Sequence, residues 1–292
     1  MTSKTSIALL GAATIISAAT LHAQTPASPP VVGDVIVSGS ELMEEKPDGV
    51  NGEPEWVRQR RFSTTRVYIQ KDPGEMGVEE WWRTQFFDGG KVTQRLKNEF
   101  EIGLPYRMQL DIYENLTHVN DGTGWQQEEV AVELRYAFAD WNVIPGNPTL
   151  YLEYAFAHEG SDAIEAKFLL GGELARSKGW HWGLNFVCQQ QIWGEQKTEW
   201  QIAGGISKTL IDDKLSIGAE GKWSAPQGEP SEAIFGPSIQ WRPTHNTHLD
   251  VVTMAGLTHS SPNAECWLIF GFDFGGGSSK QKGYKPTSVS GY

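Results

Sequence analysis

The chain has 292 residues, of which 39% are hydrophobic, and a formal net charge of -12 at pH 7. This composition excludes a helical membrane protein of many spans, because each span needs about 20 consecutive apolar residues. The acidic balance, without a basic cluster, also argues against a nucleic-acid partner.

The N-terminal region has the layout of a cleavable signal peptide over residues 1–23. Lys4 supplies the positive charge, residues 7–20 form an apolar stretch, and Ala23 is a small residue before the expected cleavage site. Residues 24–60 are rich in Pro, Gly and acidic residues and show no sustained period. They are predicted to form a disordered periplasmic leader, with a plug in a barrel lumen as the alternative.

From residue 61 onward, apolar residues recur at every second position. Val130, Val132, Leu134, Tyr136 and Phe138 alternate with Glu129, Ala131, Glu133, Arg135 and Ala137, which is the period of a β-strand with one apolar face. Similar segments continue to residue 274. We therefore predict an all-β fold, a transmembrane antiparallel up-and-down β-barrel of about 12 strands over residues 61–274, followed by a flexible periplasmic tail over residues 275–292.

A soluble β-sandwich also alternates, so further features must decide between the two folds. Tight turns alternate with longer polar connections, as in outer-membrane barrels. Tryptophans lie near the strand ends, where two interfacial girdles would be expected. Trp141, Trp180, Trp182 and Trp241 are assigned to the periplasmic girdle, and Trp125, Trp193, Trp200 and Trp223 to the outer one.

The last predicted strand, residues 267–274, alternates aromatic residues and resembles the C-terminal targeting strand of outer-membrane barrels. This resemblance implies a Gram-negative-type outer membrane as the location. It also implies outer-membrane lipid and the barrel-assembly machinery as partners.

The inward face predicted by this register carries an excess of carboxylates, which would favour cations in a conducting lumen. The alternative is that these charges pair across strands and fill the barrel. The predicted lumen-lining residues are Arg83, Arg95, Lys97, Glu99, Glu101, Asp111, Glu129, Glu133, Arg135, Glu153, Lys167, Glu173, Glu220, Lys222, Arg242, Asp250 and Asp273.

Several segments resemble a family of uncharacterised bacterial outer-membrane barrels. They are PEW at 54–56, RFSTTRVY at 61–68, EIGLPYRMQLD at 101–111 and GPSIQWRP at 236–243. The chain is more distantly similar to putative transporters grouped with phenol meta-pathway proteins. The resemblance implies a fold and a location more firmly than an activity.

The function predicted from these features is a pore or facilitator for small-molecule solutes. The first alternative is a non-conducting structural or surface barrel. The second is a lipid-modifying enzyme, suggested by His259, Ser260, Ser261 and Asn263, which also fit an ordinary turn. No catalytic residue, metal or cofactor is predicted, and His245 and His248 are expected to be solvated turn residues.

Overall fold

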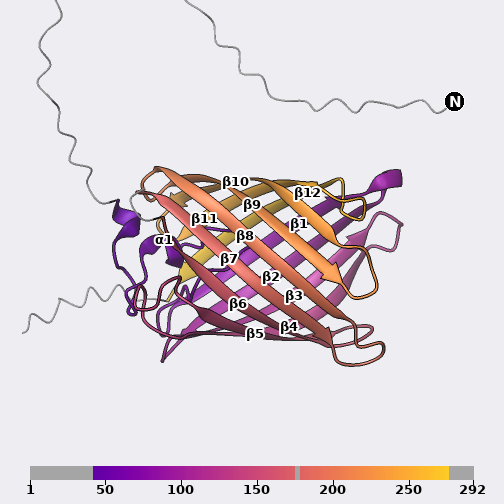
Figure 1. The fold of residues 1–292 in the computed structure, drawn as a ribbon, viewed down its shortest axis with the longest axis horizontal. Coiled ribbons are helices and arrows are strands. Elements are labelled where there is room, and N and C mark those ends of the chain that lie inside the picture. Colours follow the sequence, from indigo (N-terminus) through magenta and orange to yellow (C-terminus); the bar gives the residue numbers. More distant parts are fainter. Residues whose placement is uncertain (1–41, 175–177, 276–292) are drawn as a thin grey trace, which may run out of the picture. The chain divides into compact units, whose positions relative to one another are not determined.

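The computed structural model describes residues 42–174 and 178–275. The expected signal peptide, residues 24–41 of the leader and residues 276–292 of the tail lie outside the described residues. Within them, twelve antiparallel strands form a closed barrel, in which each strand pairs with the next and β1 pairs with β12 (Figure 1). The predicted fold class is confirmed. The strands are β1 (Met76–Phe86), β2 (Val92–Leu104), β3 (Met108–Val119), β4 (Trp125–Ala137), β5 (Thr149–Ala157), β6 (Ala163–Glu173), β7 (Trp180–Gln191), β8 (Thr198–Ile211), β9 (Leu215–Pro226), β10 (Glu232–Thr244), β11 (Thr247–Gly256) and β12 (Ala264–Phe274).

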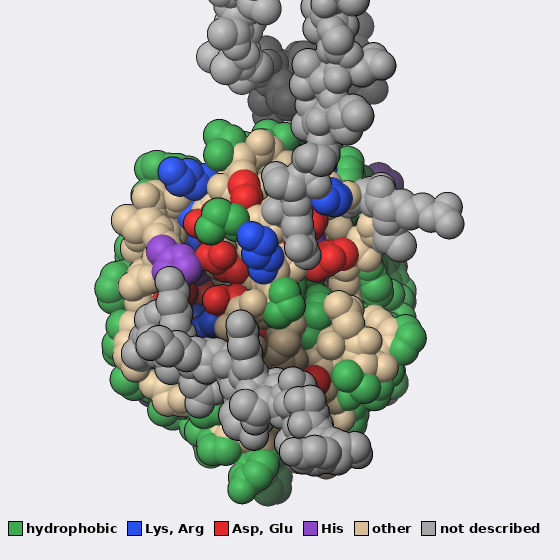
Figure 2. All heavy atoms as spheres, turned by 90° about the vertical axis from the view of Figure 1, so that its left-hand side faces the viewer, with side chains coloured by type: hydrophobic (Ala, Val, Ile, Leu, Met, Phe, Trp, Pro, Cys, Tyr) green, Lys and Arg blue, Asp and Glu red, His purple; other side chains and the backbone are tan. Residues whose placement is uncertain are grey.

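The outer surface of the barrel is apolar and the inner surface is polar, which reverses the usual distribution in a soluble protein. Large hydrophobic side chains from every strand are exposed on the outside, among them Phe100, Phe156, Ile217 and Phe270. Hydrophobic side chains form the rim in the view along the barrel, and charged side chains gather inside it (Figure 2). A closed barrel leaves no strand edge unpaired, and this exterior suits hydrocarbon. The closure and the apolar exterior are those of a transmembrane β-barrel.

Residues 42–75, which we call the plug, close one end of the barrel (Figure 1). Residues 53–71 are buried in the lumen, and the residues on either side of them lie at the barrel mouth, where several are exposed. The plug contains two short helices, η1 (Met43–Glu45) and α1 (Glu55–Arg58). No helix in the described residues is long and apolar enough to cross a membrane. Trp56, Phe62 and Tyr68 of the plug are each at most 2% exposed.

The plug differs from the sequence prediction in two ways. Residues 42–60 are ordered rather than a disordered leader, and residues 61–71 lie in the lumen rather than in the barrel wall. The reason is that the backbone of the plug bonds to wall side chains instead of to a neighbouring strand. Thr64 N donates to Glu220 at 2.7 Å, and Arg66 N donates to Asn185 Oδ1 at 2.7 Å. Such bonds impose no sequence period.

Glycines on the inner wall make room for the plug. A Cβ at Gly183 on β7 would lie 2.8 Å from Thr65 Cγ2, and one at Gly205 on β8 would lie 2.7 Å from Phe62 Cδ1. Any larger residue there would collide with the plug. These glycines therefore fit a wall that is shaped around an occupant.

The connections at the two barrel ends differ less than the sequence suggests. The longest, residues 138–148, is at the plug end, where short turns were predicted. Its Trp141 is 8% exposed and packs edge-on against Trp56 and Tyr68, with ring centroids 5.6 and 5.3 Å apart. The assignment of Trp141 to a lipid-facing girdle is therefore wrong, because the plug gives its ring an apolar partner inside the barrel.

Candidate functional site

All of the predicted lumen residues lie on the inner side of the barrel, where they form two groups. One group lines a cavity between the plug and the barrel end opposite it, which we call the vestibule: Arg83, Arg95, Lys97, Glu129, Glu153, Lys167 and Lys222. The other group contacts the plug or lies beside side chains that do: Glu99, Glu101, Asp111, Glu133, Arg135, Glu173, Glu220, Arg242, Asp250 and Asp273.

Basic side chains of the plug neutralise the acidic group. Arg66 Nη2 lies 3.0 Å from Glu99 Oε1, and Lys71 Nζ lies 3.2 Å from Glu101 Oε2. Arg60 pairs with Glu79 on β1. Buried charges are costly unless they are paired and hydrogen-bonded. The carboxylate excess that the sequence places on the wall is therefore largely a complement to the plug.

A second ionic cluster joins the wall to the plug around Arg135 of β4, which is fully buried. Its Nε lies 2.5 Å from Glu133 Oε1, and its guanidinium also pairs with Asp111. Arg135 Nη1 donates to Gln70 Oε1 of the plug at 2.9 Å. Each of the three guanidinium nitrogens thus has an acceptor, which allows the charge to remain buried.

The N-terminal half of the plug combines hydrogen bonds to the wall with aromatic contacts. Trp56 stacks on His181 of β7, with ring centroids 4.3 Å apart, and its Nε1 donates to Glu173 Oε1 at 3.1 Å. Beside it, burial raises the pKa of Glu53 to about 7. Burial, together with the nearby Asp213, raises the pKa of Glu55 to about 7.

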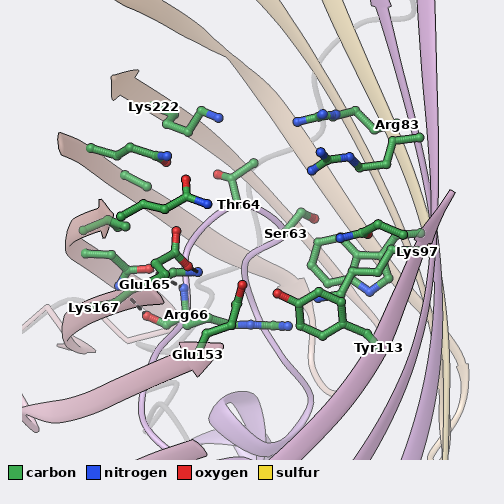
Figure 3. Close-up of a pocket in the computed structure, with 18 of the residues that line it drawn as sticks. Ser63, Thr64, Arg66, Arg83, Lys97, Tyr113, Glu153, Glu165, Lys167 and Lys222 are labelled. Carbon is green, nitrogen blue, oxygen red and sulfur yellow. Dashed lines mark hydrogen bonds and ion pairs between the residues drawn. The ribbon is translucent and has the colours of Figure 1, made fainter. Parts of the chain in front are cut away.

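The vestibule is a polar cavity of about 240 Å³ (Figure 3). Ser63, Thr64 and Arg66 of the plug contribute to its lining, and β1, β2 and β9 are among the strands that complete it. Lys97 Nζ lies 3.7 Å from the ring centroid of Tyr113 and 3.0 Å from Glu99 Oε2. A water-accessible polar cavity that ends on the plug is the part of this barrel best suited to hold a solute.

Two groups of described residues have the composition of a metal site, but other side chains of the protein already bind the carboxylate oxygens that would coordinate a metal. Glu99, Asp111 and Glu133 lie together, with the guanidiniums of Arg66 and Arg135 bound to them. The other group is Glu55, Asp213 and His245. There the Gln59 amide donates to both carboxylates, at 2.9 Å to Asp213.

The two histidines near the last tight turn have different environments. His245 is exposed, as predicted, although its Nδ1 lies 3.1 Å from Glu55. His248 is 3% exposed and lies between Asp250, at 3.0 Å, and Glu79, at 3.3 Å. The prediction that His248 is solvated is wrong, because its strand register turns the ring inward.

The loop that suggested an enzyme has the bonds of a turn. Ser260 Oγ donates to Ser231 O at 2.6 Å, and Ser261 Oγ donates to Ala233 O at 2.8 Å. Among the described residues, no hydrogen bond joins His259 to either serine. The serines thus link neighbouring connections at the barrel end opposite the plug.

Sequence reasoning did not identify the plug side chains Arg60, Arg66 and Lys71 as part of the lumen. One signal was available. Basic residues recur between 60 and 71 among apolar ones such as Phe62 and Tyr68, directly before a barrel whose inner face is acidic. Opposite charge on a preceding segment is what a plug would need.

Comparison with solved structures finds an outer membrane channel, a porin and the beta domain of an autotransporter. The chain is similar to an outer membrane channel from Pseudomonas putida F1, with 10% identity, 69% of this chain and 96% of that chain covered, and a TM-score of 0.49. It is also similar to the NanC porin, with 12% identity, coverage of 68% and 98%, and a TM-score of 0.48. The beta domain of the Bordetella autotransporter BrkA gives 9% identity, coverage of 69% and 100%, and a TM-score of 0.46. No protein-family model matches the chain, and no curated protein matches its sequence.

Proposed function

We propose that this protein is a gated facilitator for small solutes in the outer membrane, with the plug as its gate. The observation that carries the proposal is the vestibule, a cavity of about 240 Å³ that ends on Ser63, Thr64 and Arg66 of the plug. A barrel with only a structural role has no need of a polar cavity inside it. A gated facilitator needs a cavity where the solute enters and a barrier that can move to open a path.

The contacts of the plug are consistent with a movable barrier. Among the described residues, it is held to the wall by hydrogen bonds, ion pairs and aromatic packing, with no disulfide. Because the plug continues directly into β1 at Met76, it can shift without leaving the barrel. Its basic side chains would then stay in the lumen and continue to offset the acidic wall.

In this proposal the barrel wall is acidic, as the sequence predicts, but the lumen that contains the plug is not. With the plug in place, Glu99 and Glu101 are paired with Arg66 and Lys71. We expect strong cation preference only when the plug is removed, because the wall carboxylates then face water without their partners.

A non-conducting structural barrel is the second candidate, and the dense packing of the plug favours it. Trp56 and Tyr68 are fully buried. The two candidates differ in what happens when the plug is loosened without altering the wall. A gated barrel should then conduct, whereas a structural barrel stabilised by its plug should lose stability without gaining ion flow.

Planar-bilayer recordings of the refolded protein test this difference. We expect the full chain to be mostly closed and Trp56→Ala to show frequent openings, because the substitution removes the stacking on His181 and the bond to Glu173. Tyr106→Ala, on an exposed turn, is the matched control and should behave as the full chain. If Trp56→Ala folds and never conducts, the structural barrel is the correct candidate.

A further inference from the structure

Two arginines face each other on neighbouring strands in the vestibule. Arg83 of β1 and Arg95 of β2 are register partners, and both side chains line the cavity. Like charges directly opposite each other in a sheet repel. Arg95 pairs with Glu128, but within the described ranges Arg83 has no carboxylate within 4.0 Å. The wall therefore supplies this pair of guanidiniums with one close counter-charge.

A third cation points toward the same space. Lys222 of β9 also has no ion pair in the part of the chain that the structure describes, and its side chain points across the cavity toward Arg83 (Figure 3). Arg95 Nε is buried and has no hydrogen-bond partner among the described residues. Donors are thus available here without matching acceptors.

Two carboxylates that line the cavity near this space are engaged with neutral donors. Glu265 accepts hydrogen bonds from Gln85 at 2.6 Å and from Trp267 at 2.5 Å, and Glu129 accepts one from Asn115 at 2.6 Å. These contacts hold the two carboxylates against the wall. They reduce the local positive potential, but among the described residues neither carboxylate lies within 4.0 Å of a charged nitrogen of Arg83 or Lys222.

We propose that this part of the vestibule binds the oxyanion group of a small solute, a carboxylate or a phosphate, between Arg83, Arg95 and Lys222. Guanidinium groups bind such anions through two parallel hydrogen bonds, and an ammonium adds a third charge-assisted bond. The bound anion would also relieve the repulsion between the two arginines. This inference rests on the proposed function in treating the vestibule as the entrance, but anion binding is measurable without transport.

Calorimetric titration of the refolded full chain with sodium acetate and with inorganic phosphate, at constant ionic strength, tests the site. We expect saturable binding of at least one of the two, and the stronger one identifies the oxyanion class. Arg83→Gln and Lys222→Gln should each raise the Kd about tenfold or more, as loss of a charge-assisted bond would do. Lys197→Gln, which removes an exposed lysine in the 192–197 loop, is the control for charge and should leave the Kd unchanged.

A second measurement guards against a folding defect. Because Arg83→Gln removes a like-charge contact, its thermal stability without added anion should equal or exceed that of the full chain. No saturable binding, or equal Kd values for Arg83→Gln and the full chain, would overturn the site. If no anion binds but Trp56→Ala conducts, the anion site is wrong and the proposed function stands. If an anion binds but Trp56→Ala never conducts, the anion site stands and the proposed function is wrong.

Discussion

Arg66 of the plug donates from Nη2 to both carboxylate oxygens of Glu99 on β2, at 3.0 and 3.2 Å. Both side chains are buried, and Lys97 Nζ also lies 3.0 Å from Glu99. The pair fixes the middle of the plug against the wall at the depth where the vestibule ends.

Breaking this pair should loosen the plug. Arg66→Met leaves Glu99 buried with fewer partners, so we expect the free energy of unfolding to fall by about 3 kcal/mol, at the low end for a buried pair because Lys97 remains. Arg107→Met breaks the exposed pair with Asp140 and should cost less than about 1 kcal/mol. Urea unfolding in lipid vesicles measures both. Similar losses for the two variants would contradict the role of the Arg66 contact.

The apolar exterior makes a prediction about register. Leu134 faces outward on β4, and Leu134→Arg near mid-membrane should cost about 2–4 kcal/mol. The matched control is the same substitution at an inward position, where a new charge faces water instead of lipid. Gln201 lines the vestibule, and Gln201→Arg should lower the free energy of unfolding by less than about 1 kcal/mol. Ala131 also faces inward, but it is fully buried beside Tyr113 and Ala155, where an arginine would overpack. Equal costs in vesicle-based unfolding would show that the register is wrong.

Selectivity should depend on the plug. A variant without residues 42–71 should conduct with a preference for cations, measured as a reversal potential in a salt gradient. The triple substitution Glu99→Gln, Glu101→Gln and Glu133→Gln in that variant should weaken the preference. The preference should also fade at 1 M salt, where the screening length is about 3 Å. Anion preference in the plug-free barrel would show that the wall carboxylates do not line the conducting path.

The buried carboxyl of Glu53 predicts a pH dependence. Burial raises the pKa of Glu53 from 4.5 to about 7, so between these values the folded chain binds more protons than the unfolded chain. The free energy of unfolding should therefore fall as the pH rises through this interval, by roughly 3 kcal/mol at most, and change little above it. Thermal unfolding between pH 4.5 and 8 measures the slope. Glu53→Gln should flatten it, apart from the part due to Glu55, and an unchanged slope would exclude Glu53 as its source.

The strands were predictable because successive residues of a β-strand point alternately to the two faces of the sheet, so the face of each residue follows from its neighbours in the sequence. On β4, Val132 and Leu134 face outward while Glu133 and Arg135 face inward, as the period of two requires. Bulges interrupt this rule only locally, for example at Asn115 and Leu116 of β3. Charged residues on the polar face could therefore be assigned to the lumen from the pattern alone.

The plug and its partners were not predictable in this way. Thr64 bonds to Glu220 and Arg66 bonds to Asn185, contacts between residues far apart in the sequence that leave no local signature. Trp141 was misassigned for the same reason, because its aromatic partners belong to the plug. His248 is different: it lies on the inward side of β11 with Asp250, and the period of two could have placed it there.

The position of the plug before β1 bears on the order in which the molecule can assemble. Residues of the plug are synthesised first, but Glu220 and Gln240, which bond to its backbone, belong to strands made late. The pairing of β1 with β12 also waits for the end of the chain. Contacts of such sequence separation form slowly, because the chain must first lose loop entropy. The segment that fills the centre of the barrel is thus among the first made and the last to settle, and until then its aromatic side chains stay uncovered.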